Sequence, residues 1–195
     1  MMSNLWGDEK GQTQVEGTKA TVHGYALDEA VSALQKAIRA GDQERAGFFA
    51  YELAKTPKQS WRLWRRLKVI AAEDVGGMEP LIFTVAAEQA AKAVGGEDGV
   101  MIAMRAAIEL ARWVQKHGGD RTADDMKCVF DERFKEGWQG LPIKDVDLDC
   151  HTKRGRMMGR GDGFFWRESC KLVKESPEYD KQWLEEMRKR YEGRL

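Results

Sequence analysis

Apolar residues recur with helical spacing along most of the chain. From Tyr25 onward, Leu27, Val31, Leu34 and Ile38 follow one another at intervals of three or four residues, which is typical of one face of an amphipathic helix. No pair of strands with alternating polarity is evident. The pattern therefore predicts an all-α fold.

Glycine and proline residues mark where successive helices end. Gly41 closes the first helix, Asp42 is suited to cap a second that ends before Pro57, and a third ends at Gly76–Gly77. Further helices are expected over about 80–94, 99–117, 122–137, 164–175 and 178–192. Together they predict a single helical domain of about seven to eight helices over residues 25–195, after a flexible lead-in over residues 1–24.

Two of these helices carry apolar residues whose burial can be predicted. The helix over 80–94 is apolar on most faces and is expected to be central; its residues include Leu81, Ile82, Phe83, Val85, Ala86 and Ala90. The helix from Thr122 is expected to bury Met126, Val129, Phe130 and Phe134.

The third helix combines two tryptophans with a basic cluster, SWRLWRRLK, from Ser60 to Lys68. Aromatic residues at helical spacing are most often core. Tryptophan and arginine are also enriched at protein interfaces, and the same residues could flank a DNA-binding face with Arg62 and Lys68. The candidate residues of an oligomer or partner interface are Trp61, Trp64, Arg65 and Arg66.

Two adjacent carboxylates, Glu73 and Asp74, stand at the C-terminal end of this helix, where the helix dipole disfavours negative charge. Carboxylates in this position need partners. We expect structural ion pairs with nearby arginines or contacts with backbone donors, in preference to a catalytic carboxylate pair.

Residues 25–80 resemble the C-terminal region of the RarA/MgsA family, the replication-associated recombination ATPases related to clamp loaders. In that family Arg-Arg-Leu precedes an Ala-Ser-Glu-Asp segment, an aliphatic residue, glycine and proline. The matching residues here are Arg65, Arg66, Leu67, Ala72, Glu73, Asp74, Val75, Gly76 and Pro80. The preceding helix is similar at Tyr25, Val31, Ser32, Ala33, Lys36, Ile38, Arg39 and Asp42. The similarity fades beyond Val94, and the family's late motif is at best partly present.

The resemblance implies a collar-like helical module that assembles such ATPases into tetramers. The chain has no Gly-x-x-x-x-Gly-Lys-Ser/Thr phosphate loop, so we expect no ATP hydrolysis and no enzymatic activity. The expected partners are a second copy of the chain, as a dimer or tetramer, and a replication or repair protein or DNA.

The composition of the chain further limits the classes of protein to which it can belong. Basic and acidic residues balance to a net charge of zero, which argues against a general polyanion binder. Three cysteines without paired spacing indicate reduced thiols, and no apolar run is long enough for a membrane span. We therefore expect a soluble, cytoplasmic protein without a cofactor.

Positive charge gathers instead in and just after an irregular segment over residues 139–163. Glycines interrupt its basic residues, so guanidinium and backbone N–H groups could approach a phosphate together, and an aromatic cluster follows on which bases could stack. The candidate contacts to nucleic acid or phosphate are Lys153, Arg154, Arg156, Arg160 and Trp166. The alternative is a structural loop whose arginines pair with nearby aspartates and whose aromatic residues are buried.

The same segment contains potential ligands for a metal. Asp145, Asp147, Asp149 and His151 would share one side of an extended strand, but a solvated acidic edge is the favoured interpretation and no metal site is predicted. Cys150 beside His151 suggests a nucleophile and a base, yet sequence neighbours rarely face each other, and no catalytic residue is assigned.

Two functions remain open on the sequence. The first is a non-catalytic oligomerising or adaptor protein linked to DNA replication, recombination or repair. The alternative is a sequence-tolerant nucleic-acid-binding protein that uses the segment from Lys153 to Trp166.

Overall fold

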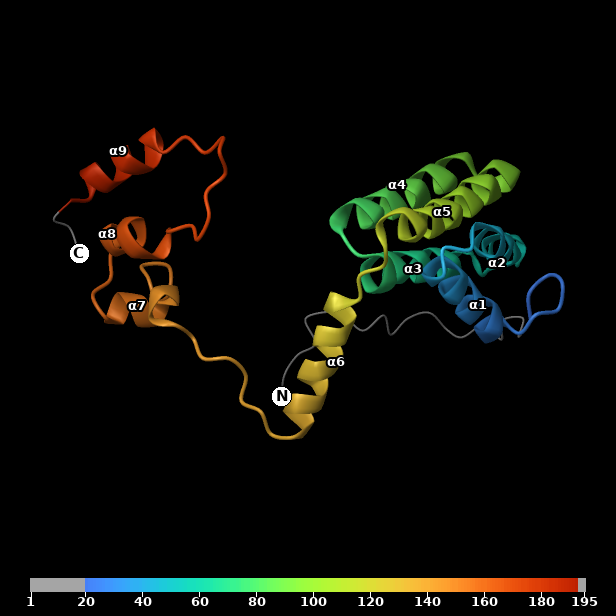
Figure 1. Cartoon of the computed structure of the whole chain (residues 1–195), viewed down its shortest axis with the longest axis horizontal. Coiled ribbons are helices and arrows are strands. Elements are labelled where there is room, and N and C mark those ends of the chain that lie inside the picture. The colour runs from blue at the N-terminus through green and yellow to red at the C-terminus, as the bar shows by residue number, and fades with distance from the viewer. Residues whose placement is uncertain (1–19, 193–195) are drawn as a thin grey trace. The chain divides into compact units, whose positions relative to one another are not determined.

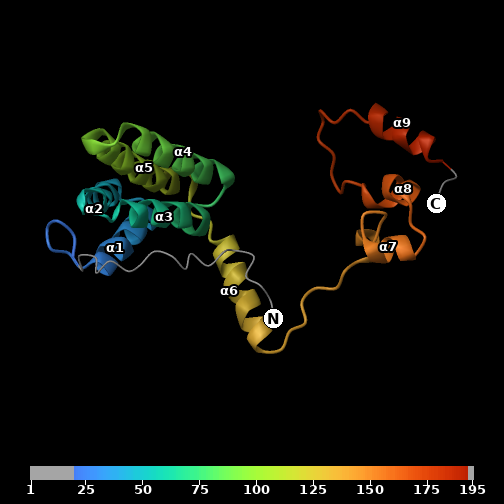
Figure 2. The ribbon, with the colours of Figure 1, turned by 180° about the vertical axis from the view of Figure 1, so that it is seen from behind.

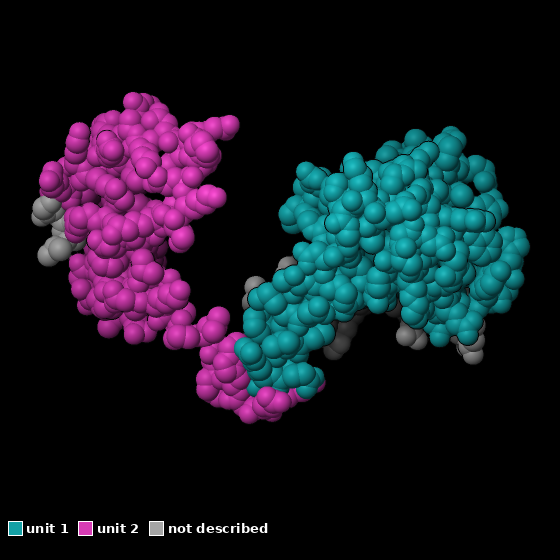
Figure 3. Space-filling view, viewed as in Figure 1, with its two compact units in different colours: residues 1–133 teal, residues 134–195 magenta. Residues whose placement is uncertain are grey.

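The computed structural model of the chain describes residues 20–192, so most of the predicted lead-in lies outside the described residues. Within this range all regular elements are helical, and one isolated bridge joins Ala20 to Ala26. The predicted all-α class is confirmed. The chain forms two compact units, unit 1 over residues 1–133 and unit 2 over residues 134–195 (Figure 3).

Unit 1 is a bundle in which α5 packs against α2 and α4, while α1 packs against α2 (Figures 1 and 2). Its helices are α1 (Leu27–Arg39), α2 (Gln43–Lys55), α3 (Ser60–Ile70), α4 (Met78–Val94), α5 (Gly96–His117) and α6 (Thr122–Lys135), and α6 runs across the boundary into unit 2.

The expected helix ends are present in unit 1. The Asp42 side chain accepts a hydrogen bond from the backbone N–H of Arg45 at 3.0 Å, which caps α2. Helix α3 continues into a π-helix, η1 (Ala71–Val75), before the chain turns at Gly76 and Gly77. Both glycines have positive φ, 77° and 81°, which other residues adopt only with strain.

The core of unit 1 lies among α1 to α5 and η1. Leu34, Leu53, Leu63, Leu67 and Leu110 are completely or almost completely buried there. Alanines on α1, α2 and α5 fill the space between these side chains, so the helices can approach one another closely.

Helix α4 is peripheral, so the prediction that it is central is wrong. The side that faces the bundle is lined by smaller or polar residues: Pro80, Thr84, Ala87, Glu88 and Ala91. The larger apolar residues face outward, and Ile82 is 61% exposed. The sequence showed an apolar helix, but it did not show which side the bundle would use.

Helix α6 also departs from its prediction. No residue of this helix is buried, and Met126, Val129 and Phe134 are all exposed. Its apolar stripe therefore has the spacing that is typical of a packed helix, although none of its residues is buried.

Unit 2 consists of short helices and turns. Its elements after α6 are the 3₁₀-helix η2 (Asp145–Asp147), α7 (Lys153–Met157), α8 (Asp162–Phe164), the π-helix η3 (Phe165–Ser169) and α9 (Gln182–Arg190). The helix predicted over 164–175 is thus shorter, and Leu148 is the one buried hydrophobic residue among the described residues of this unit.

Within residues 20–192, none of the helices combines the length and the apolar composition that crossing a lipid bilayer requires.

Candidate functional site

The two tryptophans of α3 have different environments. Trp64 is 4% exposed and belongs to the core, whereas Trp61 is 47% exposed. Trp64 is therefore a core residue and not an interface residue, because it lies on the same buried side of α3 as Leu63 and Leu67. Trp61, Arg65 and Arg66 remain on or near the surface.

A groove runs between α1 and α3, which we call the arginine groove. Its volume is about 280 Å³, and it is lined by Val31, Trp61, Arg62, Arg65, Arg66 and Val69. The guanidinium of Arg62 lies over the Trp61 ring, 5.0 Å from its centroid, in the range of a cation–π contact. The groove is thus lined by two valines and by three arginines, which form its cationic rim.

The groove continues along α1 past Asp28 and Ser32 toward Gln35. Arg66 donates a hydrogen bond to Gln35 Oε1 at 3.3 Å, and its guanidinium lies 4.0 Å from the Glu73 carboxylate. Arg65 is exposed and makes no ion pair within residues 20–192. Of the three arginines that line the groove, Arg62 and Arg66 therefore contact neighbouring side chains, and Arg65 is open to a partner.

Asp74 is the centre of a buried ion-pair network behind this groove, and the prediction of structural pairing is confirmed. Its carboxylate lies 2.8 Å from Arg39 Nη2, accepts a hydrogen bond from Arg121 Nη1 at 2.9 Å, and accepts one from Gln35 Nε2 at 2.7 Å. Because the side chain of Asp74 is inaccessible to solvent, the network ties α1, η1 and the start of α6 together.

The sequence did not identify these partners of Asp74. Neither Arg65 nor Arg66 is among them, although both lie near Asp74 in the sequence. Arg39 lies 35 residues before Asp74 and Arg121 lies 47 residues after it. No local pattern indicates pairs at such separations, so only the packing of α1 against η1 could reveal them.

In unit 2, two of the predicted phosphate-binding arginines support the backbone. Arg160 donates hydrogen bonds to the carbonyl oxygens of Asp145 at 2.6 Å and Leu148 at 2.8 Å, and pairs with the Asp145 carboxylate at 2.6 Å. Arg156 donates to the carbonyl oxygen of Cys150 at 2.9 Å. These contacts match the alternative of a structural loop.

The other predicted contacts in this segment differ in exposure. Lys153 and Arg154 are exposed in the first turn of α7. Trp166 is partly buried and packs edge-to-face on Phe165, with ring centroids 5.0 Å apart, while its carbonyl oxygen accepts a hydrogen bond from Arg188 at 2.9 Å. Lys153 and Arg154 are thus the best placed of the set for an external phosphate.

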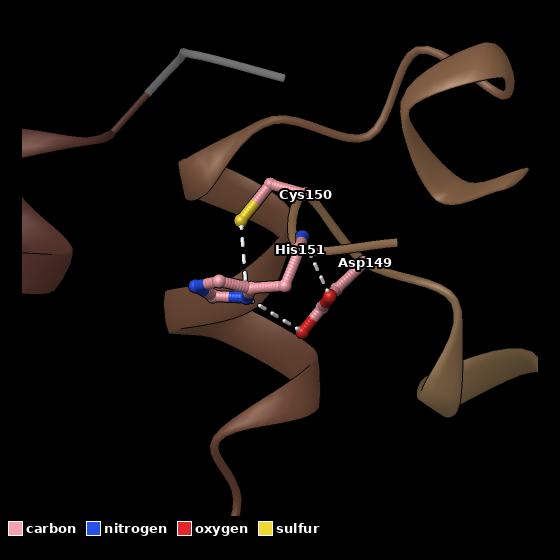
Figure 4. Close-up of side chains that lie close together, drawn as sticks. All are labelled: Asp149, Cys150 and His151. Atoms are coloured by element: carbon pink, nitrogen blue, oxygen red, sulfur yellow. Dashed lines mark hydrogen bonds and ion pairs between the residues drawn. The ribbon is translucent and has the colours of Figure 1, made fainter. Parts of the chain in front are cut away.

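Asp149, Cys150 and His151 converge in a tight turn before α7, which we call the Asp-Cys-His turn (Figure 4). Cys150 Sγ lies 3.5 Å from His151 Nδ1, and the same nitrogen lies 3.3 Å from Asp149 Oδ2. The other carboxylate oxygen accepts the backbone N–H of His151 at 2.9 Å. One imidazole nitrogen therefore faces both a thiol and a carboxylate.

Asp145, Asp147, Asp149 and His151 do not form the row that an extended strand would give them. Asp145 to Asp147 form η2, in which the Asp147 carboxylate accepts the backbone N–H of Lys144 at 2.8 Å, and Asp145 pairs with Arg160. Only Asp149 stands beside His151. In an extended strand the Cys150 side chain would point away from those of Asp149 and His151. The turn instead places its thiol beside them.

The ionisation of this turn argues against a cysteine nucleophile. Burial raises the pKa of the Cys150 thiol, and the neighbouring Asp162 and Asp149 carboxylates raise it further. The hydrogen bond from the His151 backbone N–H lowers the pKa of Asp149. At neutral pH the thiol stays protonated beside a carboxylate, the opposite of an activated thiolate.

The outer side of α4 forms an exposed apolar surface, which we call the α4 face. Five large apolar residues on this helix are exposed: Met78, Ile82, Phe83, Val85 and Val94. Exposed alanines accompany them on the same helix. Contiguous apolar surface of this kind marks protein interaction sites in soluble proteins.

No protein-family model matches this chain, and no curated protein shows significant similarity to it.

Proposed function

We propose that the protein is a non-catalytic helical assembly module that self-associates and serves DNA replication, recombination or repair. The observation that carries the proposal is the α4 face, an apolar helix surface left uncovered by the bundle. The link to DNA metabolism follows from the resemblance of residues 25–80 to the C-terminal region of the RarA/MgsA family.

The α4 face has enough apolar surface to sustain association. Burying one fully exposed large aliphatic or aromatic side chain contributes about 1.5–3 kcal/mol, whereas association costs on the order of 4–15 kcal/mol. A two-fold contact buries the face of both copies, so five partly exposed side chains per copy can offset that cost.

The arginine groove gives the module a second surface for a protein partner. Trp61, Arg65 and Arg66 occupy it, and tryptophan and arginine are the residues that most often dominate binding energies at interfaces. If a second copy covers the α4 face, the arginine groove is still available on unit 1 to bind a different protein partner.

The molar mass in solution, measured by light scattering, tests this function. We expect a dimer or tetramer for the wild type. Ile82→Glu should weaken association about thirtyfold or more, because burying an unpaired carboxylate in an apolar contact costs at least about 2 kcal/mol. Met157→Glu makes the same change at an exposed apolar residue of unit 2 and should leave the mass unchanged. A monomeric wild type, or equal effects of the two variants, contradicts the proposal.

A further inference from the structure

The three side chains of the Asp-Cys-His turn can be compared with the geometry of a metal centre. Zinc holds sulfur at about 2.3 Å and nitrogen or oxygen at about 2.0–2.2 Å in a tetrahedron, so neighbouring ligand atoms lie about 3.3–3.6 Å apart. The separation of Cys150 Sγ from His151 Nδ1 is 3.5 Å, and that of His151 Nδ1 from Asp149 Oδ2 is 3.3 Å. Two edges of such a tetrahedron are already in place.

The third pair, the sulfur and the carboxylate oxygen, lies within 4.8 Å, a separation that side-chain rotation can shorten. In Figure 4 the Cys150 sulfur and the Asp149 carboxylate both approach His151 Nδ1. The imidazole is also oriented by the Phe165 ring, whose centroid lies 4.9 Å away in an edge-to-face contact.

The backbone of this turn is held in position from several directions. Arg160 and Arg156 donate to the carbonyl oxygens of Leu148 and Cys150, and Thr152 donates to that of Asp149 through both its backbone N–H and its hydroxyl at 3.1 Å. A side chain at position 155 would collide with the Asp149 backbone, 2.1 Å from its carbonyl oxygen, so glycine is required there. Such outer contacts are what orient metal ligands in proteins.

Unit 2 also lacks the means to stabilise itself by packing. Among its described residues only one hydrophobic residue, Leu148, is buried, and this residue immediately precedes the turn. Domains of fewer than about 70–80 residues commonly need a disulfide, a metal or a partner in place of a large core. All three cysteines are free, so the Cys150 thiol is available to a metal.

We propose that Asp149 Oδ2, Cys150 Sγ and His151 Nδ1 bind one divalent cation of the zinc class at this turn. A thiolate and a carboxylate neutralise the two positive charges, and the mixture of sulfur, nitrogen and oxygen ligands selects zinc over magnesium or calcium. Water completes the fourth position.

Titration of the chelator-treated full-length protein with Co²⁺ tests this site. Tetrahedral Co²⁺ bound to a thiolate gives visible d–d bands and a sulfur-to-metal charge-transfer band in the near ultraviolet. We expect both bands to saturate at one Co²⁺ per chain and to disappear when Zn²⁺ is added. Because binding displaces the thiol proton, the apparent affinity should rise with pH.

The cysteine positions supply matched variants. The double variant Cys128→Ser/Cys170→Ser keeps only Cys150 and should retain the charge-transfer band, whereas Cys150→Ser should lose it and bind Zn²⁺ about tenfold or more weakly. Far-ultraviolet circular dichroism reports whether each variant is folded. The proposal is overturned if the double variant shows no thiolate band, or if Cys150→Ser binds Zn²⁺ as tightly as the wild type.

Discussion

Asp74 shows how a single buried carboxylate organises unit 1. It joins Arg39 from α1 and Arg121 from the start of α6, and its side chain is closed to solvent while both arginines remain partly exposed. We expect Asp74→Asn to destabilise the protein by about 2–3 kcal/mol, because hydrogen bonds to charged groups are lost and two arginines lose their counter-charge. Urea unfolding monitored by circular dichroism measures this change.

The neighbouring carboxylate is the matched control for that substitution. Glu73 is partly exposed and lies 4.0 Å from both Arg66 and Arg121. Glu73→Gln should therefore cost less than about 1 kcal/mol, as is usual for exposed pairs. Equal destabilisation by the two substitutions would show that burial does not distinguish these carboxylates.

For single residues, the sequence predicted which groups need an ion-pair partner better than it predicted which residues lie in contact. The unfavourable position of Glu73 and Asp74 at a helix end predicted ion pairs, and those pairs exist. The sequence could not separate Trp61 from Trp64, since both fit the helical spacing of a core stripe. It also did not bring Cys150, Asp149 and His151 into one cluster, because the row of metal ligands was considered only for an extended strand and the chain makes a turn there.

Among the elements, α3 and α4 are joined by one buried carboxylate with two lysine partners. Glu88 on α4 lies 2.8 Å from Lys68 on α3 and 2.8 Å from Lys92 on its own helix. Burial alone would raise the pKa of Glu88, but the hydrogen bonds from Lys68 and Lys92 outweigh it and lower this pKa below the ordinary value.

A lowered pKa gives the α3–α4 contact a defined pH dependence. The pairing stabilises the fold fully above the unfolded-state pKa of about 4.3 and loses this effect as the pH falls through the lower folded-state value. Lys68→Met should therefore reduce stability at pH 7 by about 1–2 kcal/mol, and the difference from the wild type should shrink as the pH falls below about 4.

Thermal unfolding of both proteins from pH 7 down to pH 3 measures this difference. Lys116→Met, which removes an exposed lysine near the end of α5, should leave stability almost unchanged over the whole range. A difference for Lys68→Met that grows on acidification would contradict the assigned sign.

At this scale the sequence predicted the helices well and their surfaces poorly. Gly41, Asp42 and the pair Gly76–Gly77 define helix ends through local conformation, which the sequence carries directly. The outward direction of Ile82 depends on which side of α4 meets α5, and α4 is apolar on both sides. The small and polar residues Thr84 and Ala87 face inward because the neighbouring helices lie close.

For the whole molecule, unit 1 and unit 2 present different kinds of structure. Unit 1 has a continuous core from Ala30 to Ala111 and two uncovered apolar helix surfaces, on α4 and α6. Unit 2 has a turn supported by Arg156 and Arg160 and little core. The proposed assembly rests on unit 1 alone, and the proposed metal site rests on unit 2 alone.

The alternative function, nucleic-acid binding, predicts a complex of the protein with an oligonucleotide in solution instead of a complex between copies of the chain. Arg156 and Arg160 are engaged with the backbone of unit 2, which leaves Lys153 and Arg154 as the exposed cations of that set. Binding that rests on so few phosphate contacts should be weak and should fall steeply with salt.

The measurement that tests assembly most directly is the molar mass of the wild type by light scattering, with and without a short single-stranded oligonucleotide, at low and at moderate salt. We predict the mass of a dimer or tetramer that is independent of both the oligonucleotide and the salt concentration. A monomer that gains the mass of the oligonucleotide only at low salt would contradict assembly through the α4 face and transfer the function to the segment from Lys153 to Trp166.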